Sequence, residues 1–408
     1  MSDFIVKIWL IEEPVIDHPN ADKLNIVKIG GYECITNKNV DGSPRYNQGD
    51  AVLYIPEGAV MPEWLLRRLD MWDHDKNKGV LAGSAGNRVK MIKLRGMFSA
   101  GILYPVSGGF HEPLSGEYSQ TPCMCIDVDN DVRDMHGNFV FDNGVETMEV
   151  EFDTDYAQTL EIVKYESPVP IHMAGEVMAL FGVPAKYDFE NLKSVPDMFD
   201  DFDMVVATEK LHGTFVQFGC VHGLHHEELF GKNKNIYVCS KGLGSQGLVF
   251  KNNEQNKNNL YVKALNKLLA NGLDEYLNDV VNESNLAFRI FGEIYGGNVQ
   301  DLSYDCKEPA FAAFDMMHGD DFVSYSGFFV NAAQWHIPIV PELYLGGYYH
   351  DELLKLRDGK TMLGGKNIRE GLVVKTWNNS KHPVHGRKIA KMVSPDYLLR
   401  KGTVTEYN

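Results

Sequence analysis

The chain has 408 residues, long enough for two domains, and its 44% hydrophobic and 23% charged residues are typical of a globular protein. Lysine and arginine number 39 against 56 aspartate and glutamate residues, which gives a formal net charge of −17. This balance excludes binding of nucleic acid through global positive charge, although a local basic groove is compatible with it.

Neither a membrane segment nor a disulfide framework is expected. No stretch approaches the roughly 18 uninterrupted apolar residues of a membrane helix. The apolar run 4–11 is followed by acidic rather than small residues, so it predicts a first strand and not a signal peptide. The six cysteines are scattered through a chain too large to need disulfide bonds, and we interpret them as reduced thiols of a cytoplasmic protein.

Residues 1–110 consist of short β-rich runs separated by turn residues, with one helical stretch at 62–69. The predicted strands are 4–10, 24–29, 32–36, 51–55, 89–92 and 101–104. Five or six short strands with one helix fit a small barrel of the oligonucleotide/oligosaccharide-binding (OB) type, and any small sandwich fits the pattern equally well.

Residues 111–165 differ in character because they are strongly acidic. Ten acidic residues lie from Asp127 to Asp155, where Arg133 is the only lysine or arginine. Such a segment would repel a phosphate backbone, so we interpret it as a solvated insert or linker. The Asp127-x-Asp129 spacing is that of a calcium loop, but Val132 stands where the loop needs glycine, so no calcium site is predicted.

From residue 157 onward, helical and strand patterns mix. Helices are predicted at 174–181 and 259–270 from the spacing of apolar residues. Strands are predicted at 204–208, 215–218, 236–239, 287–290, 310–314 and 372–376. Runs of strands with occasional helices favour an α+β fold with antiparallel sheets over a regular βαβ alternation.

Four short segments of this part place charges at the ends of predicted strands. The charged residues are Lys210, Glu293, Glu370 with Lys375, and Lys388 with Lys391. A charge beside a strand is more often structural than catalytic, so each segment is weak evidence alone. Together they supply a lysine nucleophile, two carboxylates for Mg²⁺ and a cluster of cations for phosphate, which nucleotidyl transfer requires.

In chain order, these segments resemble motifs I, III, IV and V of the covalent nucleotidyltransferases, which include ATP-dependent DNA and RNA ligases and GTP-dependent capping enzymes. The matching stretches are 209–214, 291–293, 370–375 and 388–391, and 311–316 is similar to motif IIIa. His212, followed by Gly213 and Thr214, is more similar to RNA ligases than to DNA ligases. Residues 162–170 and 187–191 resemble the approach to motif I in nick-sealing RNA ligases with an N-terminal OB module.

The resemblance implies that Lys210, Lys388 and Lys391 are catalytic and that Glu293 and Glu370 are metal ligands. Lys210 would attack the α-phosphate of ATP and become lysyl-AMP. Glu370 would orient hydrated Mg²⁺ (or Mn²⁺), and Glu293 would contact the ribose or a metal-bound water.

It also implies an ATP pocket around them. Phe314, or as the second choice Phe311, would stack on adenine. Lys375, Lys388 and Lys391 would surround the phosphates, and Lys391 is the favoured choice for the motif V lysine. The remaining residues of the implied pocket are Glu209, Gly213 and Lys241.

The sequence therefore predicts an OB-like domain at 1–110, an acidic insert at 111–165 and a nucleotidyltransferase domain of antiparallel sheets with flanking helices at 166–408. The predicted function is an ATP-dependent RNA ligase that seals 3′-OH/5′-phosphate nicks through lysyl-AMP and AMP-capped intermediates. Its partner would be a nicked duplex with an RNA 3′-OH strand, and we expect a cytoplasmic monomer. The candidate phosphate contacts of the OB module are Arg88, Lys90, Lys93 and Arg95.

Two alternatives remain. A capping-type guanylyltransferase would use GTP, but those enzymes carry an OB module after the catalytic domain, whereas this chain ends 17 residues after Lys391. A non-catalytic RNA-binding protein would be expected to lack one of Lys210, Glu293 and Glu370, and all three are present.

Overall fold

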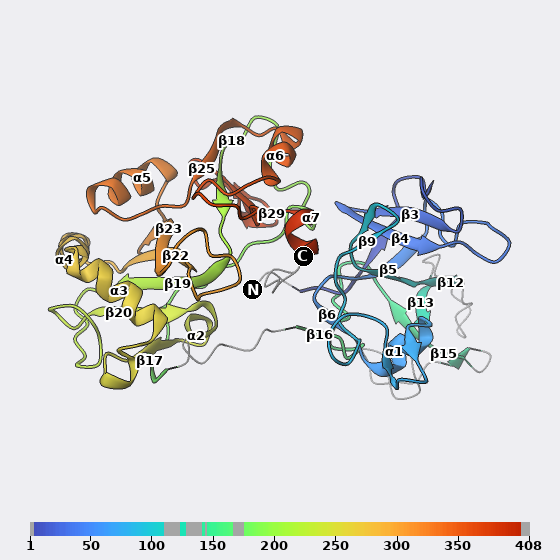
Figure 1. The fold of residues 1–408 in the computed structure, drawn as a ribbon, viewed down its shortest axis with the longest axis horizontal. Coiled ribbons are helices and arrows are strands. Elements are labelled where there is room, and N and C mark those ends of the chain that lie inside the picture. The colour runs from blue at the N-terminus through green and yellow to red at the C-terminus, as the bar shows by residue number, and fades with distance from the viewer. Residues whose placement is uncertain (1–3, 110–122, 128–140, 143–144, 166–174, 401–408) are drawn as a thin grey trace, which may run out of the picture. The chain divides into compact units, whose positions relative to one another are not determined.

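The structure is a computed structural model that describes residues 4–109, 123–127, 141–142, 145–165 and 175–400 (Figure 1). The chain divides into two compact units, with the boundary between Glu166 and Ser167. Both units are built mainly from antiparallel strands, which confirms the predicted α+β class. No helix among the described residues is long and apolar enough to span a bilayer.

The N-terminal unit is a small β-structure around one apolar core. One sheet has the strand order β1-β5-β11, a second has the order β2-β3-β4, and β9 and β10 form a hairpin that contacts β4. Their bounds are β1 Lys7–Leu10, β2 Ile16–Asp17, β3 Leu24–Ile29, β4 Tyr32–Asn37, β5 Ala51–Ile55, β9 Ile92–Leu94, β10 Met97–Ser99 and β11 Ile102–Pro105. Two short pairs complete it, β6 Ala59–Val60 with β16 Val163–Lys164 and β7 Trp72–Asp73 with β8 Lys78–Gly79.

Most of the elements predicted here are present, and one is displaced. The predicted helix is α1 (Glu63–Arg68), which buries Leu65 and Leu66 in the core. The strand predicted at 89–92 begins only at Ile92. Val89 lies outside the named strands, and its backbone forms hydrogen bonds with the backbone of Gly58 and Ala59.

The described part of the acidic segment packs onto the N-terminal unit. Strands β12 Ser107–Gly109, β13 Cys123–Asp127, β15 Val145–Val150 and β14 Phe141–Asp142 form one sheet. Ile126, Met148 and Val150 are buried in the same core cluster as Leu53 and Tyr104. This part of the segment therefore contributes apolar side chains to the fold, whereas residues 110–122 and 128–140 lie outside the described chain.

The C-terminal unit is built on two antiparallel sheets. The five-stranded sheet has the order β20-β19-β22-β23-β24, and the four-stranded sheet has the order β25-β18-β26-β29. Their bounds are β18 Met204–Lys210, β19 Gly213–Cys220, β20 Ile236–Ser240, β22 Phe288–Gly296, β23 Pro309–His318, β24 Asp321–Phe322, β25 Glu342–Gly347, β26 Gly371–Thr376 and β29 Ile389–Val393. A short hairpin, β27 Lys381–His382 with β28 Gly386–Arg387, precedes β29.

Helices cover the outer side of each sheet. Apolar side chains of three helices pack with the five-stranded sheet in the largest core cluster, namely α3 Leu260–Ala270, α4 Leu273–Ser284 and α5 Tyr325–Gln334. Helix α6 (His350–Arg357) and residues 192–199 pack against the four-stranded sheet. The opposite faces of the two sheets meet through aromatic and aliphatic side chains such as Phe215, Phe291 and Val373, and we call this the inner face.

One predicted helix is wrong. Residues 174–181 were expected to be helical, but Val177–Ala179 form strand β17, which pairs with β21 (Leu248–Phe250). A short apolar run fits either period, and here the long-range partner strand decides the outcome. The helix predicted at 259–270 is confirmed as α3, whose first turn is capped by the Asn259 side chain.

Candidate active site

The last residue of β18 carries the candidate nucleophile. Lys210 lies opposite Gly371 in the β18–β26 ladder, so the residue before β26, Glu370, is beside it. Lys210 Nζ donates to Glu370 Oε1 at 2.8 Å, and the two side chains are 15% and 1% exposed. Strand alternation places Lys210 on the same side of the sheet as Val373, on the inner face.

A glycine lets the chain pass closely beside the neighbouring strand. Gly213 opens β19 opposite Tyr295 of β22. A Cβ atom at this position would lie 2.2 Å from the carbonyl oxygen of Ile294 and 3.0 Å from Cγ of Glu293. Gly213, one of the residues of the implied ATP pocket, is therefore a close-approach position, because any side chain would push β19 away from Glu293.

Glu293 is half-buried in the middle of β22, between Phe215 of β19 and Ala312 of β23. Beside it, the Tyr261 hydroxyl bonds the Thr214 hydroxyl at 2.7 Å. Burial, with a smaller contribution from the charge of Glu293, raises the pKa of Tyr261 to about 12. The structure thus brings Glu293 next to the residues that follow Lys210, with a protonated phenol nearby.

The two candidate adenine-stacking residues lie on opposite sides of the five-stranded sheet. The Phe314 ring is on the inner face, 5.2 Å from the ring of Tyr187 and 6.0 Å from that of Phe215. The Phe311 ring packs 5.1 Å from Phe218, next to the helix-covered core. Only Phe314 therefore shares the face that carries Lys210.

Lys375 lies under Phe314 rather than beside Lys210. Its Nζ donates to the Phe314 carbonyl at 2.9 Å and lies 3.1 Å from Asp315 Oδ1. Asp315 also accepts from Arg387 at 2.7 Å and from the Tyr187 hydroxyl at 2.8 Å. Burial lowers the pKa of Lys375 to about 8. The buried amine holds the backbone of Phe314 in place through its hydrogen bond to the carbonyl oxygen.

The two motif V lysines are separated by the alternation of β29. Lys391 lies opposite Val373 and so faces inward, and its backbone is fixed by bonds to Glu190 and Leu192. Lys388 instead binds Asp200 and Asp203, with Nζ–oxygen distances of 2.6 Å to each. The structure brings Lys391, but not Lys388, to the inner face.

Two further residues of the predicted ATP pocket, Glu209 and Lys241, have their partners away from Lys210. Glu209 lies opposite Leu372 on the helix-covered face, where it accepts from the backbone N–H of Met362 at 2.8 Å. Lys241, at the start of the short helix α2 (Lys241–Ser245), pairs with Asp188 at 2.7 Å and is about half exposed. Glu209 therefore supports the strand behind Lys210 and does not share its face.

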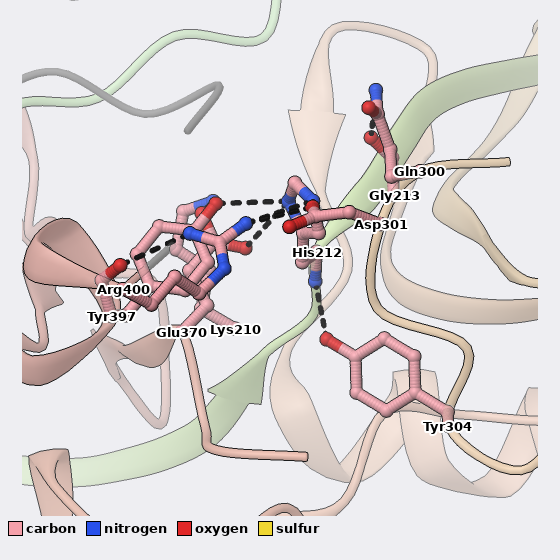
Figure 2. Close-up of polar contacts among 9 residues, drawn as sticks. All are labelled: Lys210, His212, Gly213, Gln300, Asp301, Tyr304, Glu370, Tyr397 and Arg400. Carbon is pink, nitrogen blue, oxygen red and sulfur yellow. Dashed lines mark hydrogen bonds and ion pairs between the residues drawn. The ribbon is translucent and has the colours of Figure 1, made fainter. Parts of the chain in front are cut away.

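A hydrogen-bond network that was not predicted surrounds His212, two residues after the nucleophile (Figure 2). His212 Nε2 lies 2.6 Å from Asp301 Oδ1, and Nδ1 lies 2.9 Å from the hydroxyl of Tyr397 in helix α7 (Pro395–Leu399). The same oxygen of Asp301 accepts from Arg400 at 2.8 Å, and Tyr304 accepts from the backbone N–H of His212 at 2.7 Å. The C-terminal helix is thereby tied to the loop that carries the nucleophile.

The geometry selects one protonation state of His212. Burial is the largest of the effects that lower its pKa, to about 4, so the ring is neutral at pH 7. Nε2–H then donates to Asp301, and Nδ1 accepts from the Tyr397 hydroxyl, so every polar atom of this buried ring is satisfied. Sequence reasoning placed His212 in motif I, but nothing local to it indicates Tyr397 or Arg400.

The four cations predicted to contact nucleic acid lie in the N-terminal unit. Arg88 stacks over the ring of Tyr165 at 4.2 Å, and Lys93 lies 5.1 Å from the centre of the Phe98 ring. Arg88 and Lys90 are half-buried, whereas Lys93 and Arg95 are exposed.

One group of potential metal ligands lies outside this site. Asp197, His382 and His385 hold their ligand atoms within 4.8 Å of one another. However, His382 Nδ1 accepts from the backbone N–H groups of Val384 and His385 at 3.2 Å, so neutral His382 keeps its proton on Nε2, the atom that faces Asp197. The group therefore fits a set of polar contacts between these side chains better than a metal site.

Two family models match separate parts of the chain. Residues 203–393 match the RNA ligase family model, and residues 5–106 match an OB-fold domain model. A search of curated protein sequences gives no match. The matches confirm the predicted OB-like and ligase folds.

Solved structures of Naegleria gruberi RNA ligase are similar over nearly the whole chain. The structure with PPi has 19% identity and a TM-score of 0.68 over 97% of this chain and 98% of that one. A mutant with AMP and Mn has 19% identity and a TM-score of 0.67 over the same shares of the two chains. A mutant with ATP and Mn has 18% identity and a TM-score of 0.66 over 97% of each chain. At this level of identity the likeness shows a shared fold.

The neutral state of His212 predicts an acid-sensitive C-terminal unit. Its folded-state pKa of about 4 lies below the ordinary histidine value of 6.5, so the unfolded chain takes up the proton first as the pH falls. Stability is therefore fully present above about pH 6.5 and declines toward pH 4, by up to about 3 kcal/mol. In urea unfolding at pH 7 and 4.5, the wild type should lose about 2 kcal/mol more than His212→Gln. Equal losses in the two proteins would contradict this assignment.

Proposed function

We propose that this chain, whose residues 203–393 match the RNA ligase family model and whose residues 5–106 match an OB-fold domain model, is an ATP-dependent ligase that seals nicks at which an RNA 3′-hydroxyl meets a 5′-phosphate on a duplex. The observation that carries the proposal is the Lys210 amine held at 2.8 Å by Glu370 on the inner face, beside Gly213 and Glu293. A cytoplasmic location and a monomeric state stay predictions from the sequence.

Three displacements at phosphorus make up the proposed reaction. The Lys210 amine forms a bond to the α-phosphorus of ATP as the bond to pyrophosphate breaks. The AMP group then passes from the lysine to the 5′-phosphate of the nick. Finally the RNA 3′-hydroxyl attacks that phosphate and AMP leaves. All three need positioning and charge neutralisation more than covalent chemistry by the protein, so one site can serve each of them.

Lys210 must lose a proton before it can attack, because an ammonium has no lone pair. Glu370 holds the amine in place, and Lys391 is the inward-facing cation of the neighbouring strand. Glu370 and Glu293 offer the carboxylate oxygens that Mg²⁺ and Mn²⁺ prefer, and the Naegleria ligase has been solved with ATP and Mn. A divalent ion held there would neutralise phosphate charge.

The inner face also supports adenine binding. Phe314 presents an aromatic ring there, and Tyr187 and Phe215 back it at 5.2 and 6.0 Å. The buried cluster of Lys375, Asp315 and Arg387 fixes strand β23, which carries Phe314, because the Lys375 amine donates to the Phe314 carbonyl. We therefore assign Phe314 to adenine and Lys375 to its support.

The first prediction of this proposal concerns Lys210. Incubation with α-³²P-labelled ATP and Mg²⁺ should give a labelled protein on denaturing electrophoresis, and Lys210→Ala should abolish the label because the amine that would form the bond to AMP is then missing. A nicked duplex with an RNA 3′-hydroxyl strand should then be sealed, and the matched duplex with a DNA 3′-hydroxyl should be sealed poorly. Labelling by GTP alone, or no labelling, would contradict the proposal.

The second prediction separates the two lysines of motif V. Lys391→Ala should slow lysine labelling by about 10²- to 10³-fold, the usual cost of removing one group that stabilises a developing charge. Lys388→Ala is the matched control, and its labelling rate should stay within a few-fold of wild type. Its stability should fall, because Asp200 and Asp203 lose their shared cation. The assignment fails if Lys388→Ala is the slower enzyme.

The third prediction concerns the anchor of His212. Tyr397 acts through His212 and is a positioning residue, so Tyr397→Phe should remove the donor to Nδ1 and loosen the loop that carries Lys210. We expect lysine labelling at saturating ATP to slow by about tenfold, the effect of about 1.4 kcal/mol, with little change in the Kd for ATP. Tyr349→Phe, at a 60% exposed tyrosine, is the control. A weaker Kd with an unchanged rate would assign Tyr397 to ATP binding instead.

A further inference from the structure

The N-terminal unit contains a cavity of about 510 Å³ that the proposed mechanism does not use. Its wall combines β4, the turn after it, the segment 88–94 and the start of β11. The mouth carries exposed side chains, among them Arg45, Val80 and Ile92, so the cavity is accessible within this unit.

The charge of this wall is opposite to that of the chain. Arg45, Arg88 and Lys90 line the cavity, and none of its lining residues is an aspartate or glutamate. In a chain with a net charge of −17, a concave surface with three cations and no acid favours an anionic ligand.

The interior is suited to an apolar ring with polar edges. Buried apolar side chains such as Val89 and Leu103 line it. The hydroxyl oxygen of Thr36, which is also in the wall, is buried without a hydrogen-bond partner among the described residues. A buried hydroxyl without a hydrogen bond destabilises the folded protein, so a polar ligand atom that reached it would be stabilised.

We propose that this cavity binds one unpaired nucleotide of the RNA substrate, with the base in the apolar interior and the phosphate at Arg45, Arg88 and Lys90. The inference rests on the proposed function, since it names a feature of the same substrate. A volume of about 510 Å³ is in the range of small-molecule sites and holds a nucleotide. A duplex backbone cannot enter such a space, whereas an unstacked base can, which is how single-stranded RNA is usually recognised.

The proposal divides the four predicted nucleic-acid contacts into two pairs. Arg88 and Lys90 line the cavity, whereas Lys93 and Arg95 do not. The first pair would contact the unpaired nucleotide. The second pair, on the exposed β9–β10 hairpin, would contact any phosphate backbone with little regard to pairing.

The test compares binding of the full-length protein to two nicked RNA duplexes, one fully paired and one with a single unpaired nucleotide at the nick, by fluorescence anisotropy at fixed salt. Arg45→Glu reverses one charge of the cavity, and Val80→Trp places a large ring at its mouth, where Val80 is 62% exposed. Each should weaken binding of the unpaired-nucleotide duplex by about tenfold more than binding of the paired duplex.

Lys93→Glu is the matched control, because it makes the same charge change outside the cavity and should weaken both duplexes by the same factor. Thermal unfolding confirms that the exposed substitutions leave the unit folded. Equal weakening of both duplexes by Arg45→Glu and Val80→Trp would overturn the proposal. Failure of the wild-type protein to label with ATP would instead overturn the ligase function, so the two failures are distinguishable.

Discussion

An ammonium–carboxylate pair, Lys210 with Glu370, joins two neighbouring strands at the point where both enter the inner face. Taking two charges out of water is costly, and a buried pair of this kind seldom stabilises a fold more than apolar residues would. Its presence at the end of β18 is consistent with the chemical role proposed for Lys210. The surrounding architecture serves to hold this pair: a glycine that lets β19 pass Glu293, and a sheet register that puts Gly371 opposite the nucleophile.

Three lysines that the sequence assigns to the phosphates, Lys375, Lys388 and Lys391, differ in where the fold places them. Lys391 faces inward, Lys388 is occupied by two aspartates, and Lys375 supports Phe314 from below. Strand alternation separates Lys391 from Lys388, because an odd shift along a strand moves a side chain to the other face of the sheet. Lys375 lies on the same side of β26 as Val373, but its amine is paired with Asp315. A phosphate at the inner face would therefore meet one of these three lysines directly.

Much of this organisation follows from local sequence, and some does not. The strands of the C-terminal unit and helix α3 follow from apolar periodicity, and the choice of Lys210 and Glu370 as candidates follows from motifs that are local in the chain. The partners of Lys388 are 185 and 188 residues away, and Tyr397 is 185 residues from His212. No local signal encodes such pairs. The failed helix at 174–181 has the same origin, since pairing of β17 with β21 outweighs a weak helical period.

The contact between His212 and helix α7 has a consequence for how the protein is made. At about 5–20 residues per second, a ribosome adds the 185 residues between His212 and Tyr397 in roughly 10 to 40 s. During that time, the loop that carries Lys210 and His212 lacks the hydrogen bond between His212 and Tyr397. The contact between helix α7 and His212 can therefore form only after Lys210, Glu293, Glu370 and Lys391 have all been synthesised.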